Sequence, residues 1–152
     1  MTIQKSGWLA LLGLIALTLP TLALADKAPV YTALFSDTAL KGYDPVAYFE
    51  LGKATKGSKQ FKTNWNGAQW WFVSAEHRDA FIAAPEQYAP QYGGYCAWAV
   101  GNGYTASGDP EVWSIVDGKL YVNYNESIGE KWQKDRAALI KSADANWPDV
   151  LK

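Results

Sequence analysis

His77 and Cys96 are the side chains best suited to chemistry in this chain, because they are its only histidine and its only cysteine. A thiolate and an imidazole together suit soft or borderline metals such as Cu(I), which tolerates low coordination numbers. The sole methionine, Met1, stands at the start of the sequence. Any site that needs a sulfur or an imidazole must therefore use His77, Cys96 or both.

The two residues are too far apart in sequence to meet on one helix. A shared metal site depends on the intervening stretch 85–94, whose prolines and glycines predict a bend. If this bend brings Cys96 back to His77, the pair forms a transition-metal site, with copper as the expected ion. The competing interpretation is structural, with His77 satisfied by a backbone carbonyl and Cys96 buried as a small apolar side chain. The sequence leaves both interpretations open.

A Cys–His pair could also activate a thiolate nucleophile. Asp79 is a poor candidate to orient His77, because side chains two residues apart on a helix do not face each other. The sequence contains no glycine-rich phosphate loop and no Gly-x-Ser-x-Gly elbow. A binding role is therefore favoured over an enzymatic one.

Aromatic side chains offer a second kind of site, since the chain has 8 Trp, 9 Tyr and 5 Phe. Aromatic walls with a few polar groups are typical of ligand pockets, although such rings equally form cores. The alternative function is therefore an aromatic-lined module that binds a small molecule, glycan or peptide without metal. The candidate lining residues are Tyr92, Tyr95 and Trp98, together with Trp70 and Trp71.

Residues 1–25 resemble a secretory leader. Lys5 gives a positive start, residues 8–19 form an apolar run, and Ala23-Leu24-Ala25 is a small-residue cleavage motif. The run is shorter than the ~20 residues of a membrane-spanning helix. We therefore expect cleavage after Ala25, no stable membrane insertion afterwards, and a periplasmic or secreted mature protein. In an oxidising compartment the lone Cys96 could also pair across a homodimer.

The remaining chain has the length of one domain. The formal net charge of the whole sequence is −1, and no basic run supports binding to nucleic acid. The expected organisation is an N-terminal arm over 26–40, a domain over 41–147 and a short tail over 148–152. Val30, Leu34 and Phe35 are expected to fix the arm to the domain.

Two turn motifs predict the β-hairpins that must position these side chains. Asn66-Gly67 and Asp117-Gly118 each stand between aromatic and β-branched runs, and these residues readily adopt the positive φ that two-residue turns require. The strands are expected over 60–65 and 68–73, and over 112–116 and 119–124.

Helices are predicted between and after the hairpins. Ser74 is placed to cap a helix over 75–84, on which His77 and Phe81 share the inward face. Helical turns are expected over 85–88 and 96–100, and a long helix capped by Asn125 over 126 to about 143. Two hairpins and several helices, without strand–helix alternation, predict an α+β fold.

Several motifs, in order along the chain, resemble a known family. They are Tyr43-Asp44-Pro45-Val46-Ala47-Tyr48-Phe49, the Asn66-Gly67 hairpin, Ser74-Ala75-Glu76-His77-Arg78-Asp79-Ala80-Phe81, Pro85-Glu86-Gln87-Tyr88 and Gln91-Tyr92-Gly93-Gly94-Tyr95-Cys96. Together they resemble the YHS domain family, in particular its exported, stand-alone bacterial members.

The resemblance implies a relation to treble-clef modules of copper and heavy-metal proteins. Those relatives carry three cysteines, which align with Ala47, Val73 and His77 here. Only His77 keeps a metal-binding side chain, so the relatives' cysteine site is absent and a closed, four-ligand zinc site is not expected. Any metal site that remains would be built from His77, Cys96 and Tyr or carboxylate oxygens, with Tyr92 and Tyr95 as the nearby pocket groups.

Overall fold

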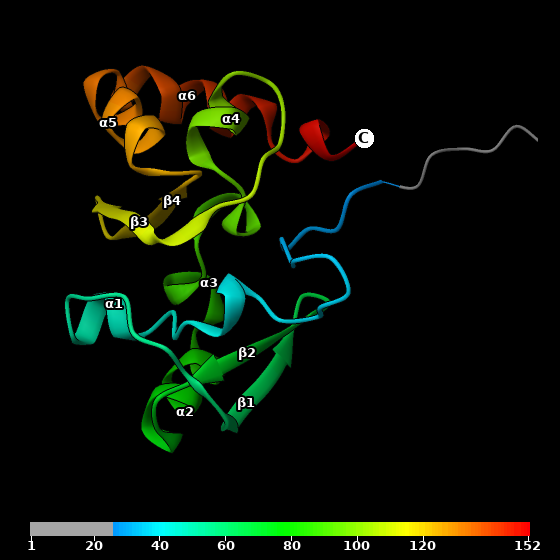
Figure 1. Cartoon of the computed structure of the whole chain (residues 1–152), viewed down its shortest axis with the longest axis vertical. Helices are drawn as coiled ribbons and strands as arrows, with labels where there is room; N and C mark the ends of the chain where they lie inside the picture. Colours follow the sequence, from blue (N-terminus) through cyan, green and yellow to red (C-terminus); the bar gives the residue numbers. More distant parts are fainter. Residues whose placement is uncertain (1–25) are drawn as a thin grey trace, which may run out of the picture.

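The computed structural model describes residues 26–152 and shows an α+β fold (Figure 1). Two separate antiparallel hairpins are accompanied by short helices, as the sequence predicts. The expected leader, 1–25, lies outside the described residues. Over 26–152, no helix is both long and apolar enough to cross a membrane.

The first half of the molecule, which precedes residues 85–94, is built on the first predicted hairpin. β1 (Ser58–Trp65) and β2 (Ala68–Phe72) pair antiparallel. Asn66 and Gly67 between them have φ values of 49° and 79°, which are the left-handed values that a two-residue turn needs. The turn fixes the register, so that alternate side chains of β2 are buried.

A helix packs against this hairpin. α2 (Ala75–Ala83) begins after Ser74, whose Oγ accepts a hydrogen bond from the backbone N–H of His77 at 3.2 Å. This cap confirms the predicted start of the helix. Phe81 is fully buried and its ring lies 5.0 Å from that of Trp70, centroid to centroid. The packing of Phe81 fixes the rotation of α2 and thereby the direction in which His77 points.

Short helices link the larger elements. η1 (Leu40–Gly42) and α1 (Ala47–Glu50) precede the first hairpin, whereas α3 (Pro85–Tyr88), η2 (Gln91–Gly94) and α4 (Ala97–Gly101) follow α2. In Figure 1, α2 lies near one end of the long axis, α4 lies near the other, and α3 lies between them. Residues 85–94, where the sequence predicts a bend, therefore form a connector that leads from the first half of the molecule to the second.

The second predicted hairpin is also present. β3 (Asp109–Val116) and β4 (Lys119–Asn123) pair antiparallel across a turn in which Asp117 and Gly118 have φ values of 51° and 72°. Successive side chains of β4 face opposite sides, as in any strand. Leu120 and Val122 join one hydrophobic cluster, and Tyr121 joins the other, so β4 separates the two.

The C-terminal part contains two helices, and the prediction of one long helix is wrong. α5 (Glu126–Lys134) does begin at the predicted cap, where Asn125 Oδ1 accepts a hydrogen bond from the N–H of Ile128 at 2.9 Å. It ends at Asp135, whose φ and ψ of −127° and 27° are not helical. α6 (Arg136–Asn146) and the single turn η3 (Asp149–Leu151) follow.

The break allows α6 to pack closely on α4. A Cβ added to Gly101 of α4 would lie 2.9 Å from the carbonyl oxygen of Leu139 in α6. Such close contact requires glycine on one helix.

The N-terminal arm is only partly held as predicted. Val30 is buried, and the N–H of Tyr31 donates a hydrogen bond to the carbonyl oxygen of Gly93 at 2.9 Å. Leu34 and Phe35, however, are 83% and 99% exposed. The expectation that they clip the arm to the domain is therefore wrong, because a turn at this position directs both side chains into solvent.

Candidate functional site

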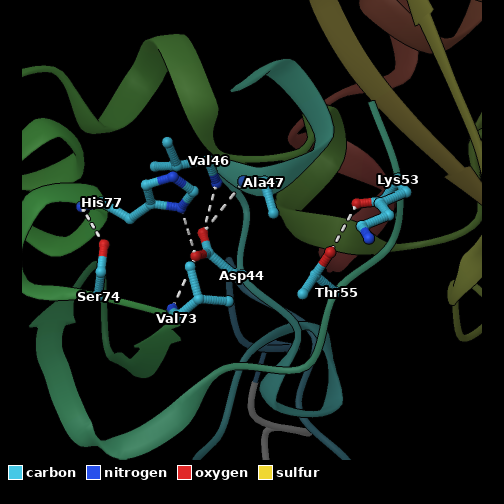
Figure 2. A network of polar contacts seen from close by, with 8 residues as sticks. All are labelled: Asp44, Val46, Ala47, Lys53, Thr55, Val73, Ser74 and His77. Carbon is cyan, nitrogen blue, oxygen red and sulfur yellow. Dashed lines mark hydrogen bonds and ion pairs between the residues drawn. The ribbon is translucent and has the colours of Figure 1, made fainter. Parts of the chain in front are cut away.

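Asp44 is a fully buried carboxylate that receives four hydrogen bonds (Figure 2). Its Oδ1 accepts from the backbone N–H groups of Val46 at 2.8 Å and Ala47 at 3.2 Å. Its Oδ2 accepts from the N–H of Val73 at 2.9 Å and lies 2.7 Å from Nδ1 of His77. Hydrogen bonds to a charged acceptor are the strong ones, and four of them offset the cost of burying the carboxylate.

Local sequence explains how the carboxylate reaches this position. An Asp followed by Pro, just before a helical turn, accepts hydrogen bonds from the N–H groups two and three residues later. The N–H of Asp44 donates to the carbonyl oxygen of Thr55 at 2.9 Å, which ties the segment to the chain before β1. Val73 directly follows β2. The first hairpin, α1 and α2 therefore converge on one side chain.

Asp44 determines which nitrogen of His77 is free. A carboxylate without a proton only accepts, so Nδ1 of His77 carries the hydrogen and donates it. Among residues 26–152, the sole fully enclosed side-chain nitrogen or oxygen without a partner is Trp132 Nε1. Nε2 of His77 is not enclosed in this way, and the side chain keeps 15% exposure. When the imidazole is neutral, its lone pair is therefore on Nε2.

This pairing has a known chemical use. A carboxylate bonded to one imidazole nitrogen fixes the ring orientation and raises the basicity of the other nitrogen, as in many metal-binding histidines. Ser74 contributes by capping α2 through the N–H of His77. Arg78 and Asp79 pair with each other at 2.9 Å on the partly exposed side of α2, as expected for a solvated helix face.

Cys96 lies in a different environment. It is fully buried just before α4, and its Sγ–H donates to Asn123 Oδ1 at 3.6 Å. Burial raises the pKa of the Cys96 thiol, so the reactive thiolate is disfavoured. A disulfide across a homodimer, considered from the sequence, would require this segment to open.

The structure does not bring His77 and Cys96 together. His77 is bonded to Asp44 within the first half, whereas Cys96 is bonded to Asn123 at the end of β4. The helices that carry or adjoin them, α2 and α4, lie towards opposite ends of the molecule (Figure 1). The predicted shared site is therefore not formed, because the connector 85–94 extends between the halves instead of folding back.

The aromatic candidates are also separated. Tyr92 lines a hollow of about 410 Å³, Tyr95 another of about 540 Å³ beside the arm, and Trp98 a third of about 190 Å³ next to Cys96. The Tyr92 hydroxyl donates to Asp144 Oδ1 at 2.8 Å, and burial followed by this bond raises the pKa of Tyr92. These three rings do not line one common hollow.

The protein offers few ligands for a closed metal site. Within the part of the chain that the structure describes, no group of three or more His, Cys, Asp or Glu side chains could hold a metal ion. A four-ligand zinc site therefore does not fit. Ala47, Val73 and His77 nevertheless gather around the single carboxylate of Asp44.

Asp44 is the site residue that the sequence did not identify. It directly precedes Pro45, and its Oδ1 caps the turn that follows by accepting a hydrogen bond from the N–H of Val46. Its contact with His77 joins residues 33 positions apart, so no local pattern contains it. The one available signal was an Asp inside the motif on which the YHS resemblance rests.

The chain matches no family model, no curated protein and no solved structure.

Proposed function

We propose that this protein is a small exported binding protein whose working group is His77, and that Nε2 of this imidazole binds a transition metal ion, with copper as the expected ion. The leader-like residues 1–25 support export. The observation that carries the proposal is the 2.7 Å contact between His77 Nδ1 and the buried Asp44.

This contact favours binding in two ways. It removes the choice of tautomer, so that the lone pair of the neutral ring is on Nε2, and it limits rotation of the ring. The side chain is 15% exposed, which supports access of a metal ion to the ring. A neutral imidazole with a fixed orientation suits borderline and soft metals better than Mg²⁺ or Ca²⁺.

A single protein ligand fits a handling role better than a storage role. Cu(I) accepts low coordination, so the remaining positions can be filled by a donor or acceptor molecule during transfer. The resemblance to the YHS family and its copper-related relatives also supports a copper-handling role. Cys96 takes no part in this proposal, because its thiol is buried against Asn123.

The test is a competition titration of the mature protein with Cu(I) against a chromophoric chelator, under reducing conditions. We expect one Cu(I) per chain in the wild type and loss of this binding in His77→Ala. Cys96→Ser should bind as the wild type does. Asp44→Asn should weaken binding about 10- to 100-fold, the usual effect of losing the group that orients a metal-bound histidine.

Asp79→Asn is the matched control, because Asp79 lies near His77 in sequence but pairs with Arg78. It should leave the affinity unchanged. The proposal is wrong if His77→Ala binds Cu(I) as tightly as the wild type, or if Cys96→Ser abolishes binding in a folded protein.

A further inference from the structure

The geometry points to a second binding site, for a neutral saccharide, in the hollow of about 410 Å³ that lies between the two halves. Its walls come from the N-terminal arm, the first hairpin, the connector 85–94, the start of β4 and the segment after α6. Ligand pockets of about 300–1,000 Å³ commonly occur where two packed units meet. The volume is therefore adequate for one or two sugar rings.

Two indole rings form rigid walls of this hollow. Trp65 packs against Trp70 with ring centroids 5.8 Å apart, and Trp147 packs against Tyr92 with centroids 5.9 Å apart. Trp65 and Trp147 remain partly exposed. The face of an indole carries negative charge density, which attracts the polarised C–H groups on one face of a pyranose ring. Two partly exposed indoles thus line the same hollow and can contact a sugar ring there.

Four polar side chains surround the indoles, namely Asn66, Glu86, Gln91 and Lys119. Within residues 26–152, none of the three ion pairs involves Glu86 or Lys119. The four supply both donors and acceptors, because amides do both, a carboxylate accepts and an ammonium donates. A sugar hydroxyl also donates and accepts, so a polyol can satisfy this mixed set.

The charges favour a neutral ligand. Glu86 and Lys119 carry opposite charges and line the same hollow, so neither an anion nor a cation is preferred overall. A small zwitterion would satisfy these two charges. It would leave the amides of Asn66 and Gln91 unused, however, and a rigid apolar face matches the two indoles better.

This site is independent of the proposed metal site. Neither Asp44 nor His77 lines the hollow, and the saccharide proposal needs no metal. Failure of either test therefore leaves the other intact.

The test uses the mature protein labelled with 5-fluorotryptophan and titrated with cellobiose, whose β-linked glucose rings present continuous C–H faces. We expect saturable changes in the fluorine signals of Trp65 and Trp147, with a dissociation constant of about 1 mM. Sorbitol has similar hydroxyls but no rigid ring, and should bind at least about 10-fold more weakly. Glycine betaine, a zwitterion, serves as the competing probe.

Two substitutions test the polar lining without removing a packed ring. Asn66→Gly keeps a residue that tolerates the positive φ of the turn, and Gln91→Ala removes one amide. Each should weaken cellobiose binding about 3- to 10-fold, the effect of one hydrogen bond. Gln87→Ala is the same change at a position that does not line the hollow, and should have no effect.

The proposal is contradicted if cellobiose causes no saturable change or binds no better than sorbitol. It is equally contradicted if glycine betaine binds in preference to cellobiose, or if Gln91→Ala and Gln87→Ala behave alike.

Discussion

A solitary histidine becomes a directional ligand only when its ring and tautomer are fixed, and Asp44 does both for His77. The carboxylate is fully buried and bonds to three backbone N–H groups, so it cannot move without losing them. The imidazole is therefore anchored to the backbone of two further elements. This anchoring distinguishes His77 from a surface histidine that binds metals weakly.

Asp44→Asn tests how much the network contributes to stability. The amide has one acceptor oxygen in place of two, so at least one buried N–H loses its partner. We expect the free energy of unfolding to fall by about 3 kcal/mol or more, since hydrogen bonds to buried charges are each worth ~1.5–3 kcal/mol. Urea denaturation measures the change.

The exposed Asp79→Asn is the comparison for this measurement and should change stability by less than about 0.5 kcal/mol. Equal effects of the two substitutions would show that Asp44 is not the structural centre described here.

The burial of Cys96 gives a second prediction at this scale. Because burial raises the pKa of the thiol, iodoacetamide should label almost none of the native protein at pH 8 and one thiol per chain in guanidinium chloride. Mass spectrometry gives the stoichiometry. Rapid labelling of the native protein would contradict the burial of Cys96 and would allow a Cys96-linked dimer.

A helix cap can be predicted from the sequence when it depends on one residue and its near neighbours in the chain. The caps Ser74 and Asn125 are both confirmed, because each satisfies helix N–H groups a few residues away. The partner of His77 was not predictable in the same way. Asp44 lies on a separate segment, and only the folded hairpin brings the two together.

At the scale of elements, both hairpins were predicted because Asn-Gly and Asp-Gly turns carry their own conformational requirement. The break at Asp135 and the exposure of Phe35 were not predicted. Each depends on what packs against the segment: α6 lies against α4, and the turn at Leu34 and Phe35 projects from an arm that is otherwise bonded to the body. Tertiary contact decides such cases, and local propensity does not.

The contact between Gly93 in η2 and the N-terminal arm is the contact between elements that can be tested most directly. A Cβ at this position would lie 1.8 Å from the carbonyl oxygen of Pro29, and φ is 62°. Gly93→Ala should therefore displace the arm, lower the melting temperature and expose residues 28–33 to proteases. Gly118→Ala is the control, because φ is 72° but nothing lies within 4 Å.

The control should cost about 1–2 kcal/mol from backbone strain alone, and Gly93→Ala should cost clearly more. If both variants melt at the same temperature and resist proteolysis equally, the arm is not seated on η2.

For the whole molecule, two hydrophobic clusters meet at β4, and several tyrosines are buried within or beside them. Burial raises the pKa of Tyr48, Tyr92, Tyr95 and Tyr121. Tyrosine in an unfolded chain titrates near pH ~10. Above that pH the unfolded state releases protons that the folded state retains, so the folded state becomes less stable.

The free energy of unfolding should thus be unaffected by these groups below pH ~10 and fall as the pH rises beyond it. Urea titrations from pH 8 to pH 11, with phenolate absorbance recorded in parallel, measure this dependence. Tyr92→Phe should make the decline shallower. A stability that stays constant or rises up to pH 11 would contradict the assignment of these rings to the interior.

The central claim, that Asp44 leaves Nε2 of His77 free to bind a metal, is tested most directly by the ¹⁵N spectrum of the protein's only histidine, recorded with and without one equivalent of Cu(I). We expect a proton on Nδ1, an unprotonated Nε2, and a shift of the Nε2 signal when Cu(I) is added. A proton on Nε2, or an Nε2 signal that Cu(I) does not move, would contradict it.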